Sequence, residues 1–241
     1  GHAALFFADP APDLLILAAG FDVPVEKTDI TSTLAQSVGA VADATGRDWT
    51  VVETDLRKHP LFRQTKWDFS HGGALAFLGY LLRERIGTFL ISSSSDQDHL
   101  GPWGSHPDMD SLWSSRFLTF RHVGQDTYRS KKLHRLLNHP LARTLVQRHL
   151  RVCYENPGRD GNCGRCQKCV LTRINLHRDA PGIHLDTMPE DIPLVQAIEA
   201  LPPLRNPLAI NLRKELVGGP DARVDAALRD LIRRSEEGLH E

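Results

Sequence analysis

The stretch CYENPGRDGNCGRCQKC, residues 153–169, contains all four cysteines of this 241-residue chain. They are spaced C-x9-C-x2-C-x2-C, at Cys153, Cys163, Cys166 and Cys169. Four thiolates at this spacing can surround a Zn²⁺ ion as a closed tetrahedron, with no position left for a substrate. The pattern therefore predicts a structural zinc site, and any catalytic chemistry is expected elsewhere in the chain.

Other interpretations of the four cysteines explain the spacing less well. A four-thiolate iron–sulfur cluster is the main alternative. Disulfides are disfavoured because nothing in the sequence marks the chain for export. A redox C-x-x-C motif is disfavoured because such motifs occur as a single pair, whereas three overlapping cysteines stand here.

The composition argues against two broad classes of function. Hydrophobic residues make up 41% of the chain, enough for a sizeable core, and the formal net charge is −1. A general nucleic-acid binder would need a basic surface. No apolar run approaches the length of a membrane span, and the start GHAALFFADP has no signal-peptide pattern. We therefore expect a cytoplasmic protein without nucleic-acid or membrane partners.

Short apolar segments alternate with helical segments in the first half of the chain. Helices are expected at Ile30–Thr45 and His71–Arg85, the second with Ser70 as its N-cap. This alternation predicts an α/β fold: a parallel five-stranded sheet, with helices on both faces and ligands at the carboxyl ends of the strands. The expected strands are Ala3–Phe7, Leu14–Ala19, Trp49–Thr54, Thr88–Ser92 and Phe117–Val123.

Three regions are predicted along the chain. They are a nucleotide-binding α/β domain at residues 1–150, a zinc knot at 151–177 and a helical C-terminal extension at 178–241. The last helix, Asp221–Glu237, carries several arginines beside apolar residues. That pattern favours amphipathic packing or the contact surface of a homodimer.

Three segments together resemble one protein family. They are HLRVCYENPGRDGNCGRCQKCVLTRINL (residues 149–176), GPWGSHPDMDSLWSS (101–115) and HGGALA (71–76). The first resembles the zinc segment of the 7-cyano-7-deazaguanine synthase branch of the PP-loop ATP pyrophosphatases. Over residues 3–176 the resemblance implies a five-stranded parallel sheet, with ATP and Mg²⁺ as cofactors. It also implies a reaction in which ATP adenylates a carbonyl or carboxylate, releasing pyrophosphate, before a nitrogen or sulfur nucleophile displaces AMP.

The long loop at residues 93–116 is expected to bind the substrate. Its aromatic and acidic side chains suit a planar heterocycle, although a loop that buries its own tryptophans would look similar. Asp110 and His106 are the predicted catalytic residues, and alanine at either is expected to abolish turnover while leaving the melting temperature nearly unchanged. The predicted substrate-binding residues are Trp103, Ser105, Asp108 and Trp113. The residues predicted to hold ATP are Phe7, Gly20, Phe21, Asp22, His71 and Gly72.

One feature of the family pattern is missing from these residues. The family places a Ser-Gly-Gly-x-Asp-Ser phosphate loop after its first strand, but here AALFF is followed directly by ADPAPDLLILAA. Six residues between Phe7 and Leu14 are too few for a crossover between parallel strands, which predicts missing residues between about Phe7 and Asp9. The expected function is ATP-dependent activation of a small, heterocyclic substrate for attack by ammonia or sulfide. The alternative is a zinc-stabilised nucleotide-binding protein without catalysis.

Overall fold

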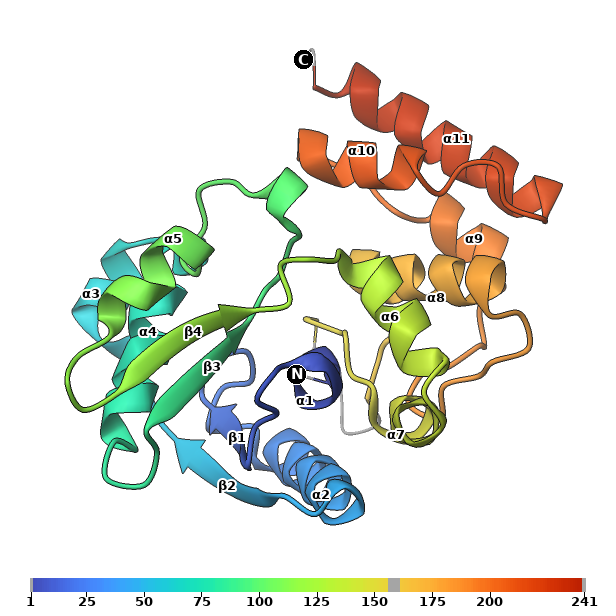
Figure 1. Cartoon of the computed structure of the whole chain (residues 1–241). Helices are drawn as coiled ribbons and strands as arrows, with labels where there is room; N and C mark the ends of the chain where they lie inside the picture. The colour runs from blue at the N-terminus through green and yellow to red at the C-terminus, as the bar shows by residue number, and fades with distance from the viewer. Residues whose placement is uncertain (1, 156–160, 240–241) are drawn as a thin grey trace. The chain divides into compact units, whose positions relative to one another are not determined.

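The chain forms two compact units, Gly1–Ala142 and Arg143–Glu241. The computed structural model describes residues 2–155 and 161–239, and Figure 1 shows their helices and strands. The first unit contains all the strands of the described residues, whereas the second is helical around the cysteines. Each unit has its own hydrophobic core.

The first unit contains two small parallel sheets. β1 (Leu14–Ala19) pairs with β2 (Asp48–Glu53), and β3 (Thr88–Ser92) pairs with β4 (Thr119–Val123). Helix α2 (Thr28–Thr45) connects β1 to β2 and ends at Gly46, which adopts a left-handed conformation as its C-cap. The prediction of one five-stranded sheet is therefore wrong: the described residues contain four strands, paired two by two.

The segment expected to be the first strand is a helix instead. α1 spans His2–Phe7, and the Ala8 N–H donates to the Ala4 carbonyl at 3.0 Å, so the helical turn continues past Phe7. Alanine and leucine favour a helix, in which the backbone groups pair locally and need no neighbouring strand. The argument for missing residues after Phe7 depended on a strand there, and it no longer holds.

Helix α4 (Trp67–Leu81) begins and ends four residues before the predicted bounds. Ser70 is not its N-cap but lies inside the first turn, where Ser70 Oγ donates to the Lys66 carbonyl at 3.2 Å. The helix packs on the core of the first unit, which includes Phe89 and Phe120. Gly79 makes this packing possible because a Cβ there would lie 2.6 Å from the Phe120 ring.

Short helices fill the remaining connections of the first unit. The long loop between β3 and β4 contains three of them, at residues 97–99, 107–110 and 111–113, and is therefore more ordered than the sequence suggested. The additional elements are η1 (Leu56–Lys58), α3 (Pro60–Gln64), η2 (Gln97–His99), α5 (Pro107–Asp110), η3 (Ser111–Trp113) and α6 (Arg129–Leu137).

The second unit is built on helices that follow the cysteines. Its core gathers Val170, Ile198, Leu228 and Leu231, which are almost completely buried. Asp221 caps the last helix by accepting hydrogen bonds from two backbone N–H groups of the first turn, as expected for that boundary. The helices of this part of the chain are α7 (Pro140–His149, which begins in the first unit), α8 (Gln167–Asp179), α9 (Leu194–Glu199), α10 (Pro207–Lys214) and α11 (Ala222–Glu237).

Gly20, directly after β1, combines a positive φ with a close approach of backbone atoms. Its φ is +101°, and a Cβ added there would lie 1.7 Å from the Thr54 carbonyl oxygen. Gly20→Ala is expected to lower the free energy of unfolding by about 3 kcal/mol, because backbone strain and a backbone clash add. Gly46→Ala is the matched control: Gly46 also has a positive φ, but no atom lies within 4 Å of an added Cβ. Gly46→Ala should lower the free energy of unfolding by only about 1 kcal/mol. If urea unfolding shows that both variants lose the same free energy of unfolding, the close approach to Thr54 does not matter for stability.

Candidate functional site

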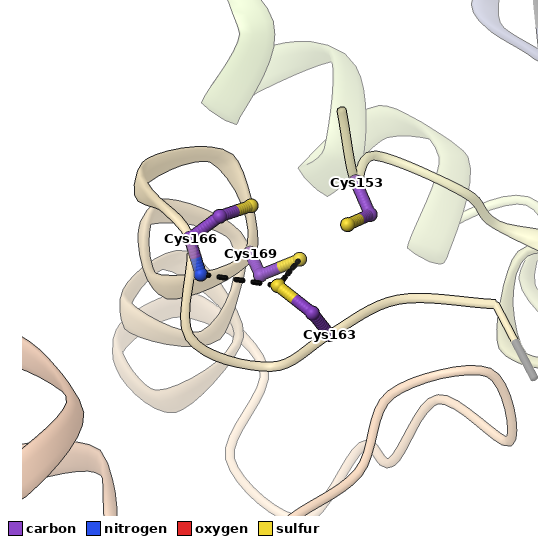
Figure 2. A group of neighbouring side chains, drawn as sticks. All are labelled: Cys153, Cys163, Cys166 and Cys169. Atoms are coloured by element: carbon purple, nitrogen blue, oxygen red, sulfur yellow. Dashed lines mark hydrogen bonds between the residues drawn. The ribbon is translucent and has the colours of Figure 1, made fainter. Parts of the chain in front are cut away.

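The four cysteines come together as their spacing predicted. The Sγ atoms of Cys153, Cys163, Cys166 and Cys169 all lie within 4.8 Å of one another. In Figure 2, Cys163 and Cys166 lie on the turn that leads into α8, Cys169 lies on that helix, and Cys153 approaches from a separate segment. The Sγ atoms of Cys163 and Cys169 are 3.9 Å apart, close to the roughly 3.8 Å that a tetrahedron of 2.3 Å zinc–sulfur bonds requires.

All four cysteines are buried and none forms a disulfide. The side-chain contact between Cys166 and Cys169 lowers the pKa of Cys166 to about 4 and raises that of Cys169. Burial raises the pKa of the Cys163 thiol. Without a cation, the cluster therefore favours one thiolate and opposes ionisation of its neighbours. A divalent metal offsets this cost, so the donor set suits a closed four-thiolate site.

Asn162 joins the two arms of the cysteine cluster. Its side-chain oxygen accepts from the backbone N–H groups of Val152 and Cys153 at 2.8 and 3.0 Å. Its amide nitrogen donates to the Leu150 carbonyl at 2.9 Å and to Thr187 Oγ1 at 3.0 Å. The residue before Cys163 is thus tied to the segment that carries Cys153. The sequence does not reveal this role, because the partners of Asn162 lie 9 to 25 residues away along the chain.

Asn162→Ala is expected to lower metal affinity by about ten- to a hundredfold, because partners that orient the ligands are lost. It should also lower the free energy of unfolding by roughly 3 kcal/mol, since several buried backbone groups lose their partner. Metal titration with a competing chelator measures the first effect and urea unfolding the second. Asn138→Ala, at an exposed helix end in the first unit, is the control. Unchanged metal affinity in Asn162→Ala would contradict this role.

A second buried polar cluster lies at the end of β4. Asp110, at the end of α5, is completely buried, and its Oδ2 lies 2.6 Å from His122 Nδ1. The same carboxylate accepts from Ser105 Oγ at 2.8 Å and from the His106 backbone N–H at 3.2 Å. His122 Nε2 is also buried and has no hydrogen-bond partner among the described residues. One nitrogen of His122 is therefore oriented by Asp110, and the other is left for a ligand or a proton.

The electrostatics of this cluster favour an ionised Asp110. Burial opposes ionisation, but hydrogen bonds from His122, Ser105 and the His106 N–H outweigh it, so the pKa of Asp110 lies below its ordinary value. An ionised carboxylate only accepts hydrogen bonds, so His122 Nδ1 carries a proton. In a neutral ring the lone pair is then on Nε2, which is the arrangement of a histidine base.

The predicted catalytic and substrate-binding residues fall into different environments. Asp110 is the centre of the buried cluster and Ser105 is one of its partners. His106 acts locally, because its Nδ1 accepts from the Asp108 N–H and so caps α5. Asp108 is exposed, and Trp103 and Trp113 are partly exposed. His122 was not predicted, since the sequence around it indicates only a strand.

The first turns of α4 and the long loop lie side by side. The rings of His71 and Trp103 are 5.6 Å apart. A Cβ added at Gly72 would lie 1.6 Å from the Gly104 carbonyl oxygen, so only glycine allows this approach. His71 Nδ1 is 3.0 Å from the Trp67 carbonyl oxygen within the same helix.

The other residues predicted to hold ATP lie in different surroundings. Phe21 is buried, with its ring edge-on to Trp67 at 5.4 Å, so it cannot stack on a base. Phe7 lies in α1 beneath the Arg135 guanidinium, and Asp22 is exposed. Gly20 lies against the Thr54 carbonyl oxygen. The Ser-Gly-Gly-x-Asp-Ser loop, with which the family holds the phosphates of ATP, does not occur in the sequence.

Comparison with protein-family models, with curated proteins and with solved structures found no match for this chain. Within the described residues, none of the helices is both long enough and apolar enough to span a membrane.

Proposed function

We propose that the protein binds one structural Zn²⁺ ion through Cys153, Cys163, Cys166 and Cys169. The observation that carries this proposal is the convergence of four buried Sγ atoms within 4.8 Å of one another. Zinc is preferred to other metals because a closed set of four thiolates suits its tetrahedral coordination. The ion would join the segment before Cys153 to the first turn of α8, and so stabilise the second unit.

We also propose that the first unit is an enzyme that activates a small substrate with ATP. The reaction is the one implied by the sequence resemblance: a carbonyl or carboxylate is adenylated and then attacked by ammonia or sulfide. The buried Asp110–His122 pair supports it, because His122 Nε2 can accept the proton that the attacking nucleophile loses. Nε2 is buried, so the segment that covers it must move before a substrate reaches it.

The direction of the hydrogen bonds determines which chemistry the Asp110–His122 pair can support. Ser105 Oγ donates to Asp110 and not to the histidine, so Ser105 is not activated as a nucleophile. All four cysteines are in the metal cluster, which leaves none to form a covalent intermediate. The side chains therefore support proton transfer and not covalent catalysis, and any sulfur would come from outside the chain.

The alternative is a zinc-stabilised nucleotide-binding protein without catalysis. It is favoured by two observations: residues 2–7 are helical, and the Ser-Gly-Gly-x-Asp-Ser loop of the family does not occur in the sequence. The enzyme and the non-catalytic protein would both hold a metal, but only the enzyme requires His122 for turnover.

Pyrophosphate release on mixing the zinc-loaded protein with ATP and candidate heterocyclic substrates separates the two. The enzyme proposal predicts release that is lost in His122→Gln and kept in Asp98→Asn, whose side chain is exposed on the long loop between β3 and β4. Zinc content and circular dichroism of both variants should match wild type. ATP binding without pyrophosphate release supports the non-catalytic alternative. If the protein neither binds ATP nor releases pyrophosphate, both the enzyme proposal and the non-catalytic alternative are rejected.

A further inference from the structure

Helix α4 has an exposed apolar face that the first unit does not cover. From Gly72 to Leu81 the helix contains no charged residue, yet only one side of it packs on the core. Phe69, Gly73, Phe77 and Leu81 recur every fourth residue and so share one face. Phe69, Phe77 and Leu81 are 57%, 47% and 56% exposed. A helix that is apolar on all sides is normally buried on all sides.

The long loop extends this face. Tyr80 Oη donates to the Trp113 carbonyl at 2.6 Å, and a Cβ added at Gly73 would lie 4.0 Å from the Trp113 ring. Trp113 is itself 39% exposed. Aromatic side chains contribute about 150–250 Å² each when buried. The face therefore offers roughly 400 Å² of apolar surface, about half of what one partner contributes to a stable interface.

We infer that this face of α4 is the contact surface of a symmetric homodimer, in which two copies of the helix cross antiparallel. In a twofold interface, each residue meets the same partner in both directions. With the axis between Gly73 and Phe77, the ring of Phe77 meets Gly73 of the second copy and the Trp113 ring that lies beside it. Phe69 then lies against Leu81 of that copy. Apolar side chains thus meet apolar side chains along the whole face.

The charges at the two ends of α4 agree with this arrangement. The same antiparallel register brings exposed Lys66, just before the helix, next to Glu84 of the second copy, just after it. The Glu84 side chain is 87% exposed. Both ends of the interface would then carry a pair of opposite charges, which fixes the antiparallel direction. A parallel crossing would place Lys66 beside Lys66 and Glu84 beside Glu84.

Sedimentation velocity over a range of concentrations tests this inference on the full chain. Wild type should approach twice the single-chain mass of 26.9 kDa, and Phe77→Asp should remain a monomer. Leu141→Asp is the control, since Leu141 is an exposed apolar residue on α7 and should leave the dimer unchanged. Zinc content and circular dichroism establish that each variant is folded. A wild type that is monomeric at every concentration overturns the inference, as does a Phe77→Asp variant that dimerises like wild type.

A charge exchange tests the register and does not depend on Phe77→Asp folding. Lys66→Glu and Glu84→Lys should each weaken dimerisation at least about tenfold, and the double variant should restore most of the loss. If the double variant is weaker than either single variant, the antiparallel register is wrong.

Discussion

Replacing Cys166 with serine is expected to abolish tight metal binding and to destabilise the second unit. Serine removes one of four thiolates and leaves an open site, and the binding energy of a structural zinc is part of the folding energy. We expect the free energy of unfolding to fall by about 4 kcal/mol or more, which lowers the melting temperature by roughly 8–16 °C. Metal analysis and thermal unfolding measure the two effects.

A control beside the site separates ligand loss from local disturbance. Arg165→Ser changes an exposed side chain in the same turn but keeps all four thiolates. It should change stability by less than about 0.5 kcal/mol. A strong chelator should bring wild type to the stability of Cys166→Ser and leave the variant unaffected. If Cys166→Ser keeps both the metal and its stability, the cysteines do not form the site described.

The second large effect is expected at Asp110. Asp110→Ala removes the acceptor for His122 Nδ1, Ser105 Oγ and the His106 N–H, in a cluster whose carboxylate is completely buried. Breaking a buried charged pair of this kind costs about 3–5 kcal/mol, so the melting temperature should fall by roughly 6–20 °C. The sequence alone predicted almost no change in melting temperature for Asp110→Ala, because it did not show that Asp110 is buried. Asp108→Ala, exposed on the same helix, should be nearly neutral.

Acid should weaken the contribution of Asp110. Its pKa is lower in the folded chain than in the unfolded one, so its stabilising effect is complete above the ordinary aspartate pKa of about 3.9. The effect is lost as the pH falls through the lowered value. Asp110→Asn, which keeps the shape but not the charge, should therefore lose less stability than wild type between neutral and acidic pH. Parallel loss in the two proteins would show that the carboxylate is not ionised in the fold.

The cysteine site could be predicted from sequence because its geometry is mostly local. Three of its ligands lie within seven residues, Cys163–Cys169, so their spacing alone limits where the sulfurs can point. The fourth ligand, Cys153, is held in place by Asn162, and that contact depends on tertiary structure. The spacing therefore revealed which cysteines come together but not the residue that orients them.

The strands, the first helix and the Asp110–His122 pair could be predicted from the sequence only in part. β1 and β3 were located because short apolar runs with β-branched residues mark buried strands, but strand pairing depends on distant segments. Ala3–Phe7 was assigned to a strand because its apolar run is too short to show a helical period. His122 was missed because its partner Asp110 lies twelve residues away, on a loop whose path the sequence does not specify.

Metal analysis combined with X-ray absorption spectroscopy of the purified full chain tests the central claim most directly. The account predicts one zinc ion per chain, coordinated by four sulfur atoms at about 2.3 Å. Folded protein that contains no metal would contradict it, and so would iron in place of zinc or fewer than four sulfur ligands.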